Sequence, residues 1–269
     1  AVKLAEAHLD EPFLVFNGDV ITEIDLTEML KQHRKVKPKV SIALTPVEDP
    51  TAYGVVETDK EGMVRRFVEK PPREEVTTNM INAGIYLLEP EVLGDVPAGE
   101  KCMFENWVFP RLLERGEAML SYPSGAYWID IGTPEKYLQA NHDLLREWGE
   151  EVRFQGNSEV HPSARIKGPA LIGEGCIIEE NVQITGPAVL GPGCRVERGA
   201  KIEGAVIWEN VRVGGKAVMH NCIIGSGVQA GVRSHVAQYC VIGDNVRLGE
   251  GGRVPESTRV DPDSSVRPG

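Results

Sequence analysis

The chain has 269 residues, of which 41% are hydrophobic and 26% charged, and its formal net charge at pH 7 is −11. This length favours two domains rather than one. The acidic balance argues against a nucleic-acid ligand, whose phosphates require a basic surface. Because no apolar run approaches the roughly 20 residues that span a bilayer, we expect a cytoplasmic protein with no membrane partner.

The first half has the strand and helix pattern of an α/β domain. Residues 13–16 form an apolar run typical of a strand buried on both faces. Further strands are predicted at 40–44, 53–58, 64–69 and 81–88. Helices are predicted at 25–33, 104–115 and 134–148. Thr133 is the expected N-cap of the last helix, with Pro134 at its first helical position.

Short motifs accompany these predicted elements. They place two isolated carboxylates, Asp19 and Asp130, at the ends of apolar strands, and Lys70 just before a proline. Carboxylates and an ammonium group can together hold a divalent cation and a phosphorylated small molecule. The motifs are Phe16-Asn17-Gly18-Asp19, Ala52-Tyr53-Gly54-Val55-Val56, Phe67-Val68-Glu69-Lys70-Pro71, Asn82-Ala83-Gly84-Ile85-Tyr86 and Tyr127-Trp128-Ile129-Asp130-Ile131-Gly132-Thr133-Pro134.

The two aspartates each have a functional and a structural interpretation. Asp19 is expected at the carboxyl edge of a parallel sheet, where open α/β folds bind ligands, although it could be an ordinary turn residue. Asp130 lies in a strand-like apolar stretch, where an unpaired carboxylate is costly. A metal is a natural counterion for it, but a helix cap or a salt bridge near Thr133 is the alternative.

Four more residues could bind a small molecule. Lys70 can bind a phosphate as a point charge, or it can be an ordinary exposed lysine. Asn82 carries both a donor and an acceptor and can therefore distinguish the orientation of a hydroxyl. Gly54 and Gly84 permit close approach to a ligand, or they mark a simple bulge or turn.

The second half is a repeat with a period of six. An aliphatic residue recurs at each sixth position from residue 160, the frame shortens to five from Ile202 to Ile207 and from Val213 to Val218, and it then continues to Val266. A helix cannot present this period on one face, whereas short strands joined by tight corners can. The pattern predicts a parallel β-helix, a solenoid whose coils bury their inward residues against each other. The first repeated residues are Val160, Ile166, Ile172, Ile178, Ile184, Leu190, Val196 and Ile202.

The cysteines follow the same repeat. Eighteen residues, or three repeats of six, separate Cys176 from Cys194 and Cys222 from Cys240. The pattern resembles the hexapeptide-repeat proteins, in which three repeats make one coil, and this resemblance implies that each pair lies on adjacent coils roughly 4.8 Å apart. Stacked side chains point the same way and form a disulfide poorly. We interpret these cysteines as small core hydrophobes.

The order and wording of the motifs resemble the sugar-1-phosphate nucleotidyltransferases, and among them the mannose-1-phosphate guanylyltransferases. The second half resembles the hexapeptide-repeat proteins, whose coil is left-handed with three hexads per turn. The resemblance implies a partial Rossmann-like α/β nucleotidyltransferase domain at 1–150, a left-handed parallel β-helix at 158–269 and a polar linker between them.

The resemblance also implies roles for individual residues. Asp19 and Asp130 would be Mg²⁺ ligands and, with Lys70 on the sugar phosphate, would form the catalytic set. The sugar would be bound by Gly54, Glu69, Asn82 and Gly84, with Glu69 on a hydroxyl. Glu105 matches an acidic position of the family, but the adjacent Asn106-Trp107 departs from the charged pair usual there, so no role is predicted for it.

The implied activity is formation of a nucleoside-diphosphate sugar, most closely GDP-mannose, and pyrophosphate from a nucleoside triphosphate and a sugar-1-phosphate. A glucose-1-phosphate thymidylyl- or uridylyltransferase and a non-catalytic regulatory paralogue stay open. The family carries a glycine-rich loop and a Pro-Lys-Pro element upstream of the Asn-Gly-Asp motif. We therefore expect an N-terminal segment to be missing and the chain alone to be inactive, unless it is a shortened variant.

Two further expectations concern the solenoid. It suggests a homo-oligomer formed through the β-helix. Hexapeptide acyltransferases use a histidine on their solenoid as general base, so His220 and His235 are candidates. That activity is disfavoured, because neither lies on an inward hexad position and no acidic partner is evident nearby.

Overall fold

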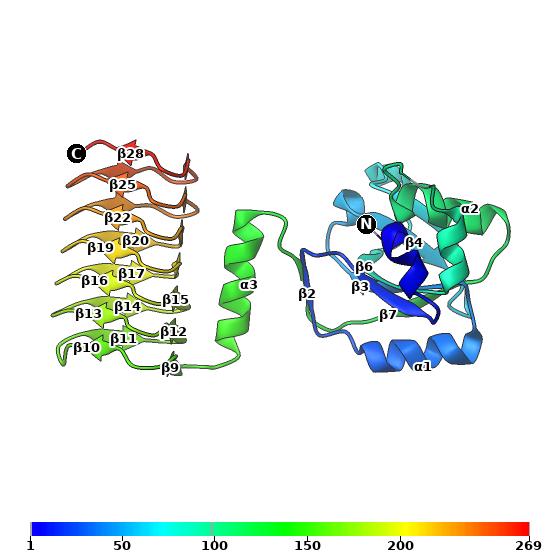
Figure 1. The fold of residues 1–269 in the computed structure, drawn as a ribbon, viewed down its shortest axis with the longest axis horizontal. Helices are drawn as coiled ribbons and strands as arrows, with labels where there is room; N and C mark the ends of the chain where they lie inside the picture. Colours follow the sequence, from blue (N-terminus) through cyan, green and yellow to red (C-terminus); the bar gives the residue numbers. More distant parts are fainter. Residues whose placement is uncertain (1, 98, 269) are drawn as a thin grey trace. The chain divides into compact units, whose positions relative to one another are not determined.

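The computed structural model describes residues 2–97 and 99–268, and its contacts divide the chain into two compact units, Ala1–Asp130 and Ile131–Gly269. Figure 1 labels helices α1, α2 and α3 and many of the strands of both units. Across these described ranges, every helix is too short or too polar to cross a membrane.

The first unit contains a mixed sheet with strand order β5-β4-β6-β3-β7, in which β1 also pairs with β6. Strands β3 and β7 are parallel, and the other pairs are antiparallel. All the predicted strands of this half are present. The strands are β1 (Phe13–Phe16), β3 (Val40–Pro46), β4 (Gly54–Thr58), β5 (Val64–Glu69), β6 (Met80–Leu88) and β7 (Met119–Pro123). A separate two-stranded ladder joins β2 (Val20–Thr22) to β8 (Trp128–Asp130).

The two predicted helices of this unit are also present. Helix α1 (Leu26–Val36) begins where the Asp25 carboxylate accepts a hydrogen bond from the Glu28 amide at 2.9 Å, and it ends at Lys37 in the left-handed conformation. The second region is a π-helical turn, Phe104–Val108, that continues into α2 (Phe109–Glu114). Short 3-10 helices cover Val2–His8, Pro50–Ala52, Arg73–Glu75 and Pro90–Asp95.

Strand β1 differs from its prediction in two ways. Leu14 and Phe16 are 41% and 42% exposed, so only one face of the strand is buried. Phe13 and Val15 pack on that face against the core. The pairing with β6 is antiparallel, so the sheet is mixed rather than the parallel one expected. Strand β1 still runs in the same direction as β3 and β7, so Asp19 follows the end of β1 that lies on the edge where those two parallel strands end. A run of apolar residues did not distinguish a central strand from one with an uncovered face.

The second unit begins with helix α3 (Pro134–Arg146) and continues as the solenoid, whose coils are stacked in Figure 1. The Thr133 hydroxyl accepts from the Lys136 amide at 3.3 Å, which confirms the predicted cap. The solenoid has three parallel sheets of seven, six and seven strands. The first sheet contains β10 (Glu159–Val160), β13 (Ile177–Ile178), β16 (Arg195–Val196), β19 (Arg212–Val213), β22 (Gln229–Ala230), β25 (Arg247–Leu248) and β28 (Ser265–Val266).

The second sheet contains β11 (Arg165–Lys167), β14 (Gln183–Thr185), β17 (Lys201–Glu203), β20 (Val218–His220), β23 (His235–Val236) and β26 (Arg253–Val254). The third contains β9 (Val152–Phe154), β12 (Ala170–Ile172), β15 (Ala188–Leu190), β18 (Val206–Ile207), β21 (Ile223–Ile224), β24 (Val241–Ile242) and β27 (Arg259–Val260). Strand β9 lies in the segment that was expected to be a linker. It pairs with β12 as the first strand of the third sheet, so this segment already belongs to the solenoid.

The period of six is confirmed with one correction. Ile202 pairs with Met219, which is 1% exposed, whereas Val218 is only half-buried. The second shortened step therefore runs from Met219 to Ile224 rather than from Val213 to Val218. Both residues at 218 and 219 are apolar, so composition did not decide which one points inward.

The interpretation of the four repeat cysteines as core residues is confirmed. Cys176, Cys194, Cys222 and Cys240 are buried free thiols within the solenoid core, each at most 1% exposed. Small side chains suit these positions because each coil packs directly on the next.

Helix α3 covers the outer face of the third solenoid sheet. Leu138 packs against Val206 and Ile223, which point outward from β18 and β21 but are buried by the helix. The His142 ring also contacts the Gly204 carbonyl at 2.8 Å. These contacts group α3 with the solenoid, whereas the boundary expected from the sequence lay after it, at residue 150. The expected domain limits themselves stay a prediction.

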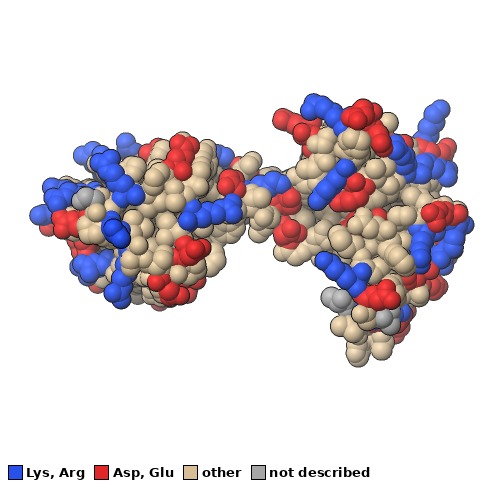
Figure 2. Space-filling view, turned by 90° about the horizontal axis from the view of Figure 1, so that it is seen from above, with Lys and Arg blue, Asp and Glu red and all other residues tan. Residues whose placement is uncertain are grey.

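Charged side chains of both signs are interspersed over the face shown in Figure 2. On the solenoid they form ion pairs between neighbouring coils, such as Arg195 with Glu179 at 2.6 Å. Arg212 pairs with Glu197 in the same way one coil further on. Exposed pairs of this kind contribute little individually to stability.

We predict that Leu138→Ala lowers the free energy of unfolding by about 3 kcal/mol, because it removes a buried leucine from the contact with Val206 and Ile223. Urea unfolding of the full chain, followed by circular dichroism, measures the change. Gln139→Ala, at an exposed position on the same helix, is the control. Equal effects of the two substitutions would contradict the packing described for α3.

Candidate functional site

The predicted site residues lie at or next to strand ends of the first unit, except Asn82 and Gly84, which lie within β6. Gly54 opens β4 and pairs with Glu69, the last residue of β5. A Cβ added at Gly54 would lie 2.8 Å from Glu69 Oε2 and 2.8 Å from Phe67 Cζ. Glycine is therefore required here because the Glu69 carboxylate and the Phe67 ring lie directly over the backbone.

Gly84 is required for a different reason. Its φ of +71° is in the left-handed region, and an added Cβ would lie 2.6 Å from Asn17 Nδ2. The Asn17 amide also donates to the Gly84 carbonyl at 2.8 Å. The Asn-Gly-Asp turn is thus held against the middle of β6, which brings two of the sequence motifs together.

The β2–β8 ladder brings Asp19 and Asp130 to neighbouring positions. Asp130 is the partner of Val20, the residue that follows Asp19. Asp19 is exposed in the turn before β2, and Asp130 is half-buried. The Tyr53 hydroxyl donates to Asp130 Oδ1 at 3.4 Å. One short ladder therefore brings together the backbones of two aspartates that are far apart in the sequence.

Lys70 lies near the same ladder through Tyr53. The Lys70 amide donates to the Tyr53 carbonyl at 2.9 Å, and the Tyr53 ring packs edge-on against Trp128 with ring centroids 5.8 Å apart. Lys70 is exposed and has a φ of +49°, an uncommon conformation for a residue with a side chain. Tyr53 thus connects the lysine to the ladder. Tyr53 is part of one of the sequence motifs, but no role was predicted for it.

A hydrogen-bonded chain joins Asn82 to Glu105. Asn82 Nδ2 donates to the Tyr86 hydroxyl at 2.7 Å, and that hydroxyl donates to Glu105 Oε1 at 2.6 Å. The Gly84 amide donates to Asn82 Oδ1 at 3.0 Å. Asn17, Tyr86 and Glu105 also line a cavity of about 760 Å³. No role was predicted for Tyr86, because only the fold shows that its hydroxyl bonds to both Asn82 and Glu105.

Glu69 has an altered acidity. Burial raises the pKa of its carboxyl group, and the nearby Glu105 raises it further, while Lys70 lowers it. Tyr86 is also affected: burial and then Glu105 raise the pKa of its hydroxyl well above its usual range. Titratable groups with perturbed pKa values are common at functional sites.

The donor set fits magnesium. Within the described ranges, no group of three or more His, Cys, Asp or Glu side chains could by itself hold a metal ion. Magnesium commonly uses one or two carboxylates and completes its coordination with water and substrate phosphates. Asp19 and Asp130 supply that kind of incomplete oxygen set, and the assignment of these two residues as ligands remains a prediction.

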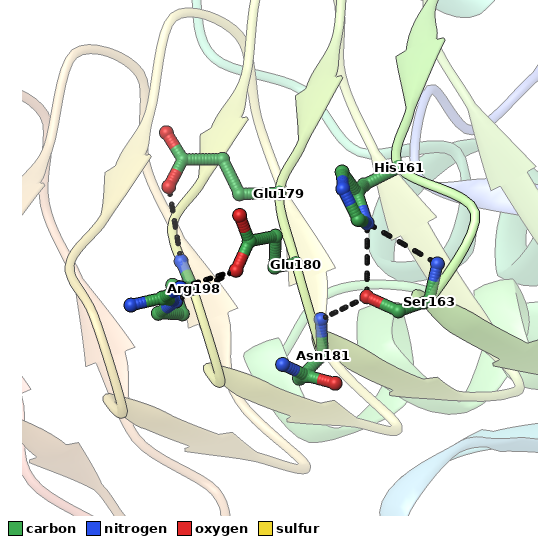
Figure 3. Close-up of polar contacts among 6 residues, drawn as sticks. All are labelled: His161, Ser163, Glu179, Glu180, Asn181 and Arg198. Atoms are coloured by element: carbon green, nitrogen blue, oxygen red, sulfur yellow. Dashed lines mark hydrogen bonds and ion pairs between the residues drawn. The ribbon is translucent and has the colours of Figure 1, made fainter.

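A second hollow, of about 670 Å³, lies on the first coils of the solenoid, and Figure 3 shows the polar contacts at and beside it. Its polar groups bond to one another: Arg198 bonds to Glu180, and its amide donates to Glu179 at 3.1 Å. Ser163 contacts His161 at 2.9 Å and accepts from the Asn181 amide. These bonds connect successive corners of the coil, so we assign the cluster to the architecture of the solenoid.

The histidines considered for acyl transfer lie elsewhere on the solenoid. His220 lies 4.0 Å from Glu203, so the expectation that it has no acidic neighbour is wrong. It also contacts the Asn221 side chain at 3.1 Å. His235 is half-buried on β23. Neither histidine lines the hollow on the first coils of the solenoid.

Comparison with known families gives two matches. A family described as "Nucleotidyl transferase" matches residues 1–147. A family described as "EIF2B subunit epsilon LbH domain", where LbH denotes a left-handed β-helix, matches residues 151–254. The fold class expected from the sequence, an α/β nucleotidyltransferase domain followed by a hexapeptide-repeat β-helix, is confirmed.

Individual relatives differ in the nucleotide and sugar named for them. The chain is 34% identical to the mannose-1-phosphate guanylyltransferase of Mycobacterium tuberculosis, covering 74% of this chain and 53% of the relative. It is 34% identical to a UTP–glucose-1-phosphate uridylyltransferase of Synechocystis, covering 76% and 56%. It is 30% identical to a glucose-1-phosphate adenylyltransferase of Desulfitobacterium hafniense, covering 96% and 69%. The chain thus spans about half to two thirds of the length of these relatives.

We predict that Gly84→Ala lowers the free energy of unfolding by about 2 kcal/mol, because a side chain at this positive φ is strained and would collide with Asn17. Urea unfolding measures it. At Gly94 an added Cβ has nothing within 4 Å, so Gly94→Ala should change stability by no more than about 0.5 kcal/mol. If Gly84→Ala left the free energy of unfolding unchanged, Asn17 would not pack closely on β6.

A second prediction concerns Glu69. Because its pKa is raised above the ordinary value of 4.5, the folded state keeps this proton to higher pH than the unfolded state. The free energy of unfolding therefore falls as pH rises through this interval. Glu69→Gln should be more stable than the native chain at about pH 7, and the difference should close below about pH 4.

Urea unfolding across that pH range checks the prediction for Glu69. Glu61→Gln, in the exposed turn between β4 and β5, controls for the loss of one negative charge. A stability difference for Glu69→Gln that stays constant with pH would contradict the described burial of this carboxylate.

Proposed function

This chain belongs to the nucleotidyl transferase family, and we propose that its first unit binds a sugar-1-phosphate with Mg²⁺ for nucleotidyl transfer. In the reaction, a phosphate oxygen of the sugar-1-phosphate attacks the α-phosphorus of a nucleoside triphosphate. The bond from that phosphorus to the bridging oxygen breaks, pyrophosphate leaves, and a nucleoside-diphosphate sugar forms. No covalent bond to the protein is needed.

The observation that carries the proposal is the register of β2 with β8. It supports a shared role for Asp19 and Asp130, because the ladder makes the residue after one aspartate the partner of the other. Bound magnesium would neutralise the charge of the reacting phosphates. The two aspartates would hold it, and the Tyr53 hydroxyl would orient the Asp130 carboxylate through its 3.4 Å contact.

The remaining residues would bind the sugar-1-phosphate. Lys70 is exposed beside the ladder and would place its ammonium group on the phosphate, which fixes the attacking oxygen. Glu69 would accept a hydrogen bond from a sugar hydroxyl, and Asn82 would contact another. Gly54 leaves the room in which the Glu69 carboxylate lies, and Gly84 leaves room for the Asn17 side chain.

We propose GDP-mannose as the product, since the motifs resemble the guanylyltransferases and the relative in Mycobacterium tuberculosis is named for mannose-1-phosphate. Relatives named for uridylyl and adenylyl transfer make glucose-1-phosphate the alternative sugar phosphate. We retain two further expectations as proposals, a cytoplasmic location and a homo-oligomer formed through the β-helix.

A regulatory paralogue without catalysis is the second candidate, because the solenoid matches a domain described from an EIF2B subunit. Such a protein would need neither the aspartate pair nor Lys70. Metal-dependent binding of a sugar phosphate therefore separates the two functions.

We predict that the chain binds mannose-1-phosphate in the presence of Mg²⁺, and that Lys70→Met weakens the binding at least about tenfold, since it removes a charged phosphate contact worth about 1.5–3 kcal/mol. Asp19→Asn and Asp130→Asn should reduce the effect of Mg²⁺ on the affinity. Isothermal titration calorimetry with mannose-1-phosphate and glucose-1-phosphate measures these changes.

Lys60→Met and Asp10→Asn, both at exposed positions of the first unit, are the matched controls. Release of pyrophosphate from GTP and mannose-1-phosphate tests turnover directly. If neither sugar phosphate binds with or without Mg²⁺, the regulatory function is the better assignment.

A further inference from the structure

We propose that Glu105 is a positioning residue of the sugar-phosphate site, which orients Asn82 through the buried hydroxyl of Tyr86. The inference rests on the proposed function of this site and adds a residue to which the motifs gave no role. Its basis is the chain of three hydrogen bonds from the Gly84 amide through Asn82 and Tyr86 to Glu105.

The chemistry of Glu105 sets the direction of this chain. An ionised carboxylate can only accept, so the Tyr86 hydroxyl gives its single hydrogen to Glu105 Oε1 at 2.6 Å. The hydroxyl oxygen then accepts from Asn82 Nδ2 at 2.7 Å. The carbonyl oxygen of the same Asn82 amide accepts from the Gly84 amide. Each link has its donor and acceptor fixed, and the Asn82 amide has one orientation.

This orientation leaves Asn82 a defined capacity for a ligand. One hydrogen of its NH₂ group and one lone pair of its oxygen are not used by the bonds to Tyr86 and Gly84. A sugar hydroxyl can both donate and accept, so it pairs with this arrangement in one sense only. If the Tyr86 hydroxyl could rotate, the contact that holds the amide would weaken.

The surrounding aromatic rings leave the Tyr86 hydroxyl little freedom other than rotation. Tyr86 is 1% exposed, and its ring packs against Phe109 and Phe104 with centroids 5.1 Å and 6.1 Å apart. Phe104 and Glu105 open the π-helical turn Phe104–Val108. Turns of this type are rare in proteins, and those that do occur are often found at functional sites. Here the turn places a carboxylate at the hydroxyl and a ring beside the tyrosine.

A structural role alone does not explain why position 105 carries a carboxylate rather than a neutral amide. Glu69 is partly buried, and the negative charge of Glu105 raises the pKa of the Glu69 carboxyl group further. A neutral amide could accept the same bond from Tyr86 without this repulsion. An ionised acceptor is, however, the stronger partner for the hydroxyl. We infer that the site retains the carboxylate because it fixes the tyrosine.

The test compares mannose-1-phosphate affinity, by calorimetry with Mg²⁺, among full-length variants. Glu105→Ala and Tyr86→Phe should each weaken binding about tenfold, the equivalent of one lost hydrogen bond to a charged group. The double variant should also lose about tenfold rather than about a hundredfold, because both changes break the same chain. Glu105→Gln keeps an acceptor and should lose only about threefold.

Two results of this titration would overturn the inference. Unchanged affinity in Glu105→Ala would show that Glu105 does not act on the ligand site. An additive, hundredfold loss in the double variant would show that Glu105 contacts the ligand independently of Tyr86. Glu114→Ala, at an exposed carboxylate on α2, is the control for loss of charge.

A second measurement needs no ligand and keeps the inference separate from the proposed function. The side-chain NH₂ signals of Asn82 are followed by nuclear magnetic resonance and assigned with Asn82→Ser. Glu105→Ala should move them as Tyr86→Phe does, and Glu114→Ala should not. If the native chain binds no sugar phosphate, the proposed function fails, and these signals still decide the inference. Unmoved signals in Glu105→Ala would disprove it.

Discussion

The pairing of β2 with β8 is the constraint on which the candidate site depends. Only three residues of each strand take part, yet they join the turn after the first strand to the last strand of the first unit. Asp19 and Asp130 are far apart in the sequence, and no local motif could bring them together. The ring of Tyr53 against Trp128 supports the same ladder from the side of β4. The geometry of the candidate site therefore depends on this one short ladder.

Two residues of the candidate site have backbone φ angles in the left-handed region, which is uncommon in and beside a sheet. Lys70 has a positive φ although it has a side chain, and Gly84 has one beneath Asn17. Such conformations are kept only where the surroundings fix them. At Lys70 the surroundings include the bond from its amide to Tyr53 and the buried Pro71 that follows. The strain lies at the residue assigned to the phosphate.

The sequence predicted much of the fold because its signals were local. The hexad repeat sets the solenoid directly, and Thr133-Pro134 marks the start of α3. Errors occurred where two apolar neighbours competed, as at Val218 and Met219, or where an apolar strand had one open face, as in β1. The network at Glu105 could not be predicted, since its hydrogen bonds join residues from different elements. The resemblance to nucleotidyltransferases is confirmed at the level of the family.

The solenoid register has a consequence for how such chains can change in length during evolution. Each strand pairs with the equivalent strand of the next coil, and a coil contacts chiefly its two neighbours. A duplication or deletion of one whole coil would preserve the alternation of inward and outward residues on all three sheets. A smaller change keeps core residues inward only where a corner absorbs it, as at the five-residue steps from Ile202 to Ile207 and from Met219 to Ile224. Elsewhere it would turn core residues outward along the remaining strands. Natural variation in this half should therefore come in whole coils or at single corners. The first unit, whose sheet pairs strands that are not consecutive in the sequence, has no comparable module.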